Sequence, residues 1–134
     1  SWLTSTEIKT LEDAKTACRK ALDMGPKIVL LTSLEHDKTP EGHIQMLAMS
    51  RNEAFTVTTP KLDLNVNGSG DCTSALFLGN YLNHNLAESL SLTAASIFHV
   101  FEKTYELKSR EIALIQAQKG FQLTKSPFPA EILF

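Results

Sequence analysis

The spacing of apolar residues predicts a helix near the start of the chain. Six apolar residues recur three or four positions apart, which is the spacing of one helix face. They are Leu11, Ala14, Ala17, Cys18, Ala21 and Leu22. Thr10 is placed to cap this helix, and Asp13 can complete a capping box three residues later. Gly25 followed by Pro26 is typical of a helix end.

The next stretch predicts a strand inside a sheet. Residues 27–33 contain an unbroken apolar run, and such runs suit strands that are buried on both faces beneath helices. We expect a central strand with parallel neighbours. Residues 35–42 are polar and contain Pro40 and Gly42. We therefore expect a solvated loop there, rather than a metal site built from its acidic residues and His36.

Alternating apolar and polar residues then predict a hairpin. Residues 43–49 alternate, and the alternation resumes at Phe55 and Val57 after a turn at residues 52–53. This period of two is that of an antiparallel pair with one buried face. On the first strand that face carries Ile44, Met46 and Ala48. Residues 58–65 have no clear period.

Helical spacing returns in the second half of the chain. We expect helices over residues 72–82, 86–102 and 110–118, and an irregular tail over residues 126–134. The first helix is expected to turn Ala75, Leu76, Leu78 and Leu82 inward. The second is expected to bury Leu90, Ala94, Ile97, Phe98 and Phe101. Strands and helices in this order indicate an α/β fold.

Composition narrows the class of protein. With 134 residues, 43% of them apolar and 21% charged, the chain has the size of one domain and can bury a core. We interpret residues 1–134 as a single segment. A formal net charge of −2 offers no basic surface for nucleic acid or an anionic membrane. No apolar run reaches transmembrane length, so we expect a cytoplasmic location.

The residue types that most often bind metals show no ligand spacing. Cys18 and Cys72 fit neither a zinc pattern nor a CxxC redox pair, and the four histidines are scattered. Cys72 follows the glycine turn at the start of a predicted helix, where the helix dipole could lower the pKa of its thiol. A packing role for this side chain is favoured. The sequence predicts no metal site.

One short motif has the features of a phosphate-binding turn. Gly68, Ser69, Gly70 and Asp71 open the predicted helix over residues 72–82. The glycines allow positive φ angles and a close approach of the backbone to a ligand. A helix N-terminus offers free N–H groups and a positive partial charge to an anion. A carboxylate beside bound phosphate can take the proton of an attacking hydroxyl.

The same four residues also have a simpler interpretation. Asp is a common N-terminal capping residue, so Asp71 could cap a glycine turn with no chemistry at all. The motif lacks the third glycine of a dinucleotide-binding fingerprint and the Gly-Lys-Ser/Thr ending of a P-loop. The motif alone does not decide between these interpretations.

The order of several stretches resembles the C-terminal half of bacterial pyridoxal kinases, which are members of the ribokinase-like superfamily. These stretches are residues 24–31, 42–47, 53–57, 59–62, 68–71, 88–95 and 106–107. Together they cover most of the chain, and their linear order is far more specific than the glycine motif. The resemblance implies a three-layer α/β/α fold with helices on both faces of a central sheet. It implies ATP-dependent phosphorylation of the 5′-hydroxymethyl group of pyridoxal, with Mg²⁺ and a homodimeric full-length enzyme.

The resemblance also implies roles for particular residues. Asp71 matches the catalytic base, which contacts the substrate hydroxyl. The anion hole corresponds to the amides of Gly68, Ser69 and Gly70. Thr32 and Ser33 fall where the family contacts nucleotide phosphates. The segment near the nucleotide base corresponds to Thr59, Pro60, Lys61 and Leu62. The helix over residues 86–102 is expected to form a wall of the adenine site.

The chain departs from the family in a few places. Ser69 stands where threonine, valine or alanine is more usual, which a turn accepts because its amide makes the contact. Thr32 stands where one subgroup has a lysine, and the connection from Leu62 to Gly68 is shorter than in some relatives. The family's N-terminal half, which contacts pyridoxal and organises magnesium, has no counterpart here. We therefore expect a fragment with negligible activity alone, exposing apolar surface and a strand edge.

Two other functions stay open at this point. The chain could be part of another ribokinase-like kinase that acts on hydroxymethylpyrimidine or a sugar. It could also be a non-catalytic module in which the turn is only a helix cap or a remnant nucleotide site.

Overall fold

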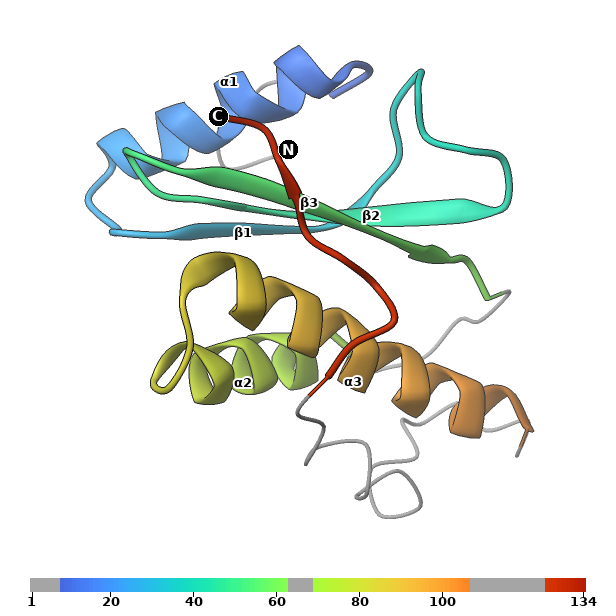
Figure 1. Cartoon of the computed structure of the whole chain (residues 1–134). Helices are drawn as coiled ribbons and strands as arrows, with labels where there is room; N and C mark the ends of the chain where they lie inside the picture. The colour runs from blue at the N-terminus through green and yellow to red at the C-terminus, as the bar shows by residue number, and fades with distance from the viewer. Residues whose placement is uncertain (1–7, 63–68, 107–124) are drawn as a thin grey trace.

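The computed structural model describes residues 8–62, 69–106 and 125–134. Within these ranges the chain forms three helices and four strands (Figure 1). In chain order they are α1 (Leu11–Asp23), β1 (Val29–Leu34), β2 (His43–Met49), β3 (Ala54–Pro60), α2 (Ser69–Tyr81), α3 (Leu86–Glu106) and β4 (Glu131–Ile132). The helix expected over residues 110–118 and the residue Gly68 lie outside the described ranges.

The first helix begins with the capping box that the sequence predicts. The Thr10 hydroxyl accepts a hydrogen bond from the Asp13 amide at 3.1 Å, and the Asp13 carboxylate accepts one from the Thr10 amide at 3.0 Å. The helix ends before Gly25, whose φ of 124° lies in the region that favours glycine. The predicted boundaries of α1 are confirmed.

The described strands form one sheet between two layers of helix. The strand order is β1-β2-β3-β4, and each neighbouring pair is antiparallel. Figure 1 shows α1 on one face of the sheet and α2 with α3 on the other. This arrangement confirms the expected three-layer α/β/α architecture.

The first strand confirms one part of its prediction and contradicts another. Ile28 and Leu30 pack against the cluster shared with α2 and α3, whereas Val29 and Leu31 pack against the cluster beneath α1. Both faces of β1 are therefore covered. The expected parallel pairing is wrong for the described residues, because the partner of β1 there is the antiparallel β2. An apolar run reports which faces are buried and not which strand lies alongside.

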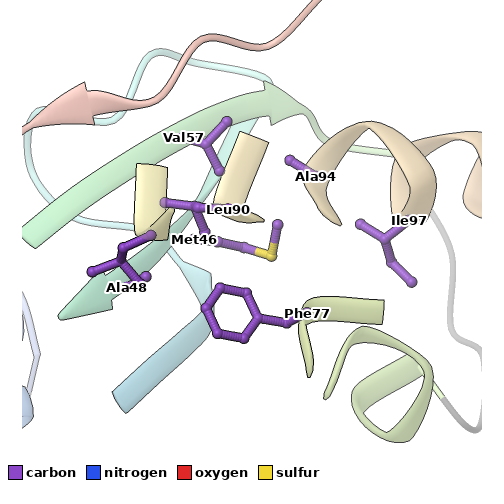
Figure 2. Close-up of a cluster of buried hydrophobic side chains, with 8 residues drawn as sticks. Met46, Ala48, Val57, Phe77, Leu90, Ala94 and Ile97 are labelled. Carbon is purple, nitrogen blue, oxygen red and sulfur yellow. The ribbon is translucent and has the colours of Figure 1, made fainter. Parts of the chain in front are cut away.

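The predicted hairpin is confirmed, and it supplies the sheet side of the main core. In β2 and β3, Met46 lies opposite Val57 and Ala48 lies opposite Phe55. Figure 2 shows Met46, Ala48 and Val57 facing side chains from the helical layer. The helix residues in this cluster are Phe77 from α2 and Leu86, Leu90, Ala94 and Ile97 from α3. The side chains that alternate along β2 and β3 thus pack against the side chains that recur at helical spacing on one face of α3.

The inward face predicted for α2 is largely wrong. Leu78 is 62% exposed and Leu82 is 76% exposed, and Ala75 is also exposed. The buried residues are Thr73 and Phe77, while Leu76 packs at the edge of the core. Because α2 carries apolar residues around its whole circumference, periodicity alone does not select the face that packs.

Three segments extend beyond their predicted limits. Residues 58–60, which show no clear period, continue β3. Helix α2 starts at Ser69 and helix α3 continues to Glu106. The tail, expected to be irregular, contains the short strand β4, which pairs with β3. Tertiary pairing therefore gives regular structure to stretches whose own pattern is weak.

Candidate functional site

A pocket of about 250 Å³ lies where the sheet meets α2 and α3, and several separate segments line it. Seven of its lining residues are ones for which the family resemblance implies binding roles: Thr32, Ser33, Thr59, Pro60, Lys61, Leu62 and Gly70. These residues come from the end of β1, from the end of β3 and the two residues that follow it, and from the first turn of α2. The fold therefore gathers residues that are up to 38 positions apart in the sequence.

The end of β1 is irregular where it reaches the pocket. The pairing register with β2 shifts between Leu31 and Leu34, which indicates a β-bulge. Ser33, inside this bulge, has a φ of 55°, a conformation that is uncommon for a residue other than glycine. Bulges redirect side chains, and such backbone conformations cluster at binding sites. Thr32 and Ser33 are thus presented to the pocket instead of continuing the strand ladder.

The segment directly after β3 brings one positive charge, that of Lys61, to the pocket. Among the described residues that line it, only Lys61 is charged. The Lys61 ammonium lies 2.6 Å from a carboxylate oxygen of Glu35, and both side chains are about half exposed. The Lys61 amide also donates to the Gly42 carbonyl at 2.8 Å. These contacts tie the segment after β3 to the loop after β1.

The loop that carries Glu35 is anchored by a buried hydrogen-bond chain. The Lys38 amide donates to His36 Nδ1, so His36 Nε2 carries the proton and donates to Gln45 Oε1 at 2.7 Å. Gln45 Nε2 in turn donates to the Thr58 hydroxyl at 2.9 Å. His36 therefore fastens the loop to β2 and β3, which gives this side chain a structural role.

The first turn of α2 places Gly70 at the pocket and Asp71 beside it. Gly70 lines the pocket, and among the residues that the structure describes no heavy atom lies within 4 Å of a Cβ added there. Its φ is not in the left-handed region, so the positive φ expected for it is wrong. Asp71 is exposed in the first turn of the helix and is not among the lining residues. The packing of the described residues therefore does not account for a glycine at position 70, and the space beside it is open to a ligand.

The anion hole predicted at the glycine turn is only partly described. Helix α2 begins at Ser69, so the amides of Ser69 and Gly70 belong to its first turn, whose N–H groups have no partner within the helix. Gly68 lies outside the described residues. The described part of the turn thus places the first residues of α2, and with them the positive end of the helix dipole, at the pocket.

An apolar wall completes the pocket. Ile44 and Met46 contribute from β2, and Ile97, Phe98 and Phe101 contribute from α3. The expectation that α3 forms a wall is consistent with this placement, but the sequence did not single out Ile44, Met46 or Thr73 as lining residues. The alternation through Ile44 and Met46 indicated only that these side chains share a buried face. The pocket therefore has a polar end at β1 and α2 and an apolar end at α3.

Both cysteines are packed. Burial raises the pKa of the Cys18 thiol to about 11, and burial also raises the pKa of the Cys72 thiol. The lowering of the Cys72 pKa that a helix start could cause is therefore not observed. Cys18 is 1% exposed, and both thiols are free. Neither has the environment of a reactive thiolate.

Cys18 is expected to be nearly inert in the folded protein. We expect it to react with a maleimide at pH 8 at least about 100-fold more slowly than in the denatured chain, because a buried thiol reacts only after local opening. The reactive thiolate should form only as the pH approaches about 11. Timed labelling followed by peptide mass spectrometry measures both rates. Equal rates in the two states would contradict the packing of Cys18 between α1 and the sheet.

The described residues lack two further features, a cluster of metal-binding side chains and a membrane-spanning helix. No group of three or more His, Cys, Asp or Glu side chains that could hold a metal ion occurs among them. Across the same part of the chain, no helix combines the length and the apolar character needed to cross a membrane.

Comparison with curated proteins finds homologues over nearly the whole chain. A pyridoxal kinase PdxY from Rubrobacter xylanophilus is 47% identical over 130 residues, which covers 96% of this chain and 45% of that protein. A pyridoxal kinase PdxY from Leifsonia xyli is 38% identical over 128 residues, covering 95% of this chain and 45% of the relative. The chain thus spans slightly less than half the length of these relatives. No protein-family model matches it.

Comparison with solved structures identifies the fold. A pyridoxal kinase from Leishmania donovani in complex with ADP and pyridoxine matches with a TM-score of 0.88 at 19% identity, covering 100% of this chain and 47% of that one. A putative phosphomethylpyrimidine kinase from Bacteroides thetaiotaomicron matches with a TM-score of 0.83 at 21% identity, covering 94% and 44%. The chain has the ribokinase-like α/β fold of these kinases, and its resemblance to bacterial pyridoxal kinases is confirmed.

Proposed function

We propose that this chain is the C-terminal half of a pyridoxal kinase and supplies its nucleotide site, anion hole and catalytic base. The observation that carries the proposal is the gathering of Thr32, Ser33, residues 59–62 and Gly70 around one pocket. These are the positions to which the resemblance assigns nucleotide binding. The chain that carries these residues is 47% identical, over 130 residues, to a curated pyridoxal kinase.

The proposed chemistry is transfer of the γ-phosphoryl group of ATP to the 5′-hydroxyl of pyridoxal. The hydroxyl oxygen bonds to the γ-phosphorus as the bond from that phosphorus to the β,γ-bridging oxygen breaks, which leaves ADP. Asp71, beside the pocket, accepts the hydroxyl proton. The amides in the first turn of α2 stabilise negative charge on the transferring group. The apolar end of the pocket accommodates the nucleotide base.

Magnesium fits the described residues poorly on their own. Mg²⁺ in kinases is commonly held by one or two carboxylates together with substrate phosphates. The described residues offer Asp71 near the pocket but no group of three potential ligands. We propose that Mg²⁺ enters with the nucleotide and uses ligands beyond these residues, and no step of the mechanism depends on it here.

The whole enzyme is proposed to be a cytoplasmic homodimer, with the pyridoxal-contacting residues in its other half. By this proposal the isolated chain has negligible activity. Light scattering on the full-length protein tests the oligomeric state.

A kinase for hydroxymethylpyrimidine is the second candidate. The match to a putative phosphomethylpyrimidine kinase, with a TM-score of 0.83, favours keeping it. Both candidates use the same pocket and the same base, so the described residues do not separate them. Assaying the full-length protein with pyridoxal, hydroxymethylpyrimidine and ribose does. We expect the highest kcat/KM for pyridoxal, and a preference for either other substrate would overturn the first proposal.

The Lys61–Glu35 pair is expected to tune nucleotide affinity in opposite directions. Lys61→Met should raise the Kd for ADP about two- to fivefold, and Glu35→Gln should lower it by a similar factor, because exposed ion pairs contribute roughly 0–1 kcal/mol. The reason is that Glu35 competes with phosphate for the one charge that Lys61 brings to the pocket. Isothermal calorimetry of ADP binding to the full-length protein at low salt measures both changes.

A charge removed elsewhere serves as the control. Arg51 is exposed and pairs with Asp23 at 3.4 Å, away from the residues that line the pocket. Arg51→Met should leave ADP binding unchanged. If Glu35→Gln weakened ADP binding as much as Lys61→Met, Glu35 would hold Lys61 in position for the nucleotide and would not compete with phosphate for its charge.

A further inference from the structure

The C-terminal tail passes close to the nucleotide pocket without lining it. Figure 1 shows the tail, in red, running from α3 past the edge of β3 toward α1. Its strand β4 pairs with β3 through Phe55 and Ile132. Its last residue, Phe134, lies over the guanidinium of Arg19 in α1 at 5.3 Å. The tail therefore contacts both helical layers.

Phe128 is held in one position by its backbone. Its amide donates to the Ser126 hydroxyl at 3.0 Å, and its carbonyl accepts a hydrogen bond from the Ser91 hydroxyl in α3. The Phe128 side chain packs against the main core. A residue whose amide and carbonyl are both engaged has little freedom to move, so its ring occupies a defined place beside α3.

The Phe128 ring contacts a residue that lines the pocket. Its centroid lies 5.2 Å from that of Phe98, with the ring planes at 79°. This edge-to-face geometry is a favourable one for aromatic pairs. Phe98 lines the pocket, whereas Phe128 does not. Phe98 is therefore placed between the pocket and the tail, and it is only half-buried within α3.

We propose that Phe128 is a positioning residue for the nucleotide: it holds Phe98 in the orientation that forms the wall of the base site. This inference rests on the proposed function, because it assumes that the nucleotide base occupies the apolar end of the pocket. Without the Phe128 ring, the Phe98 side chain gains rotamers that leave the base with a poorer wall. The C-terminal tail is by this proposal part of the nucleotide site and not only a cover for the edge of β3.

Phe128→Leu in the full-length protein tests the proposal. We expect the KM for ATP and the Kd for ADP to rise about three- to tenfold, the range that loss of an aromatic pair gives. The KM for pyridoxal and kcat at saturating ATP should stay unchanged. Phe128→Tyr keeps the ring and should restore nearly normal ATP binding, which a purely hydrophobic role for the side chain does not require.

A matched control and a double variant separate positioning from stability. Phe134→Leu alters the same tail, but at α1 and away from the pocket; it should leave the KM for ATP unchanged. In a Phe98→Ala background, adding Phe128→Leu should have no further effect on ADP binding, because Phe98 transmits the effect. Equal changes in KM for the two tail variants, no change for Phe128→Leu, or additive effects with Phe98→Ala would each overturn the proposal.

Failure of the proposed function is recognised separately. If the unaltered full-length protein binds no ADP, both the function and this inference fall. If ADP binding is normal and depends on Gly70 while Phe128→Leu has no effect, only this inference falls.

Discussion

Asp71→Asn is expected to lower kcat for pyridoxal phosphorylation by about 10²–10⁴-fold in the full-length protein, the range associated with a positioned general base. Asparagine has nearly the same shape but cannot take the proton of the attacking hydroxyl. Asp71 is exposed in the first turn of α2, so the exchange should leave the fold intact. The KM for ATP should change little, since the backbone donors beside it are retained. Steady-state kinetics at saturating ATP measure the loss.

A capping role for Asp71 makes a different prediction. An acidic residue in the first turn of a helix contributes about 0.3–1 kcal/mol through the helix dipole, so its neutralisation would lower stability slightly and leave turnover intact. Glu88 supplies the matched control, because it is an exposed acidic residue in the first turn of α3. Glu88→Gln should share the small stability loss and keep full activity. Equal activity of the two variants would remove Asp71 from the mechanism.

Gly70→Val is expected to raise the Kd for ADP about tenfold or more, which corresponds to at least roughly 1.4 kcal/mol of binding free energy. Gly70 lines the pocket, and a Cβ at this position meets no heavy atom of the described part of the chain within 4 Å. The added side chain would instead occupy the space that phosphate must enter to reach the backbone amides. Calorimetry with ADP and a thermal melt on the same sample separate binding from folding.

Gly79 provides the comparison within the same helix. It is exposed in α2, has no positive φ, and a Cβ there also meets nothing within 4 Å. Gly79→Val should therefore match Gly70→Val in its small effect on helix stability and leave ADP binding unchanged. A Gly70→Val protein that folds and still binds ADP normally would argue against a phosphate site at this turn.

Most of the elements could be predicted because their signals are local. The capping residue Thr10, the alternation through Met46 and Val57, and the helical spacing through Leu90 and Ile97 each reflect a repeat set by backbone geometry. The structure confirms these elements within a few residues. The predictions were wrong where a strand forms by pairing with a neighbouring strand without an alternating pattern of its own, as in the tail strand β4.

Several residues that line the candidate pocket could be singled out from the sequence, but the pocket that they form could not. The resemblance assigned roles to Thr32, Lys61 and Gly70, and the structure brings all three to one cavity. The resemblance did not indicate that the chain bulges at Ser33. It also did not indicate that Glu35 pairs with Lys61 or that the Phe128 ring contacts the Phe98 ring. Each of these depends on contacts between segments distant in sequence.

The sequence by itself determined the period of each element, the cap of α1, the start of a helix close to Gly70 and the kinase family that the chain resembles. The tertiary structure alone decided which face of α2 packs, which strand lies beside β1, and where the tail runs. The physical reason is that the spacing of apolar side chains along one segment reflects the geometry of that segment alone. Strand pairing and helix packing depend on contacts with other segments that are distant in the sequence. The pocket belongs to the second kind, because β1, β3, α2 and α3 form it only once they are packed together.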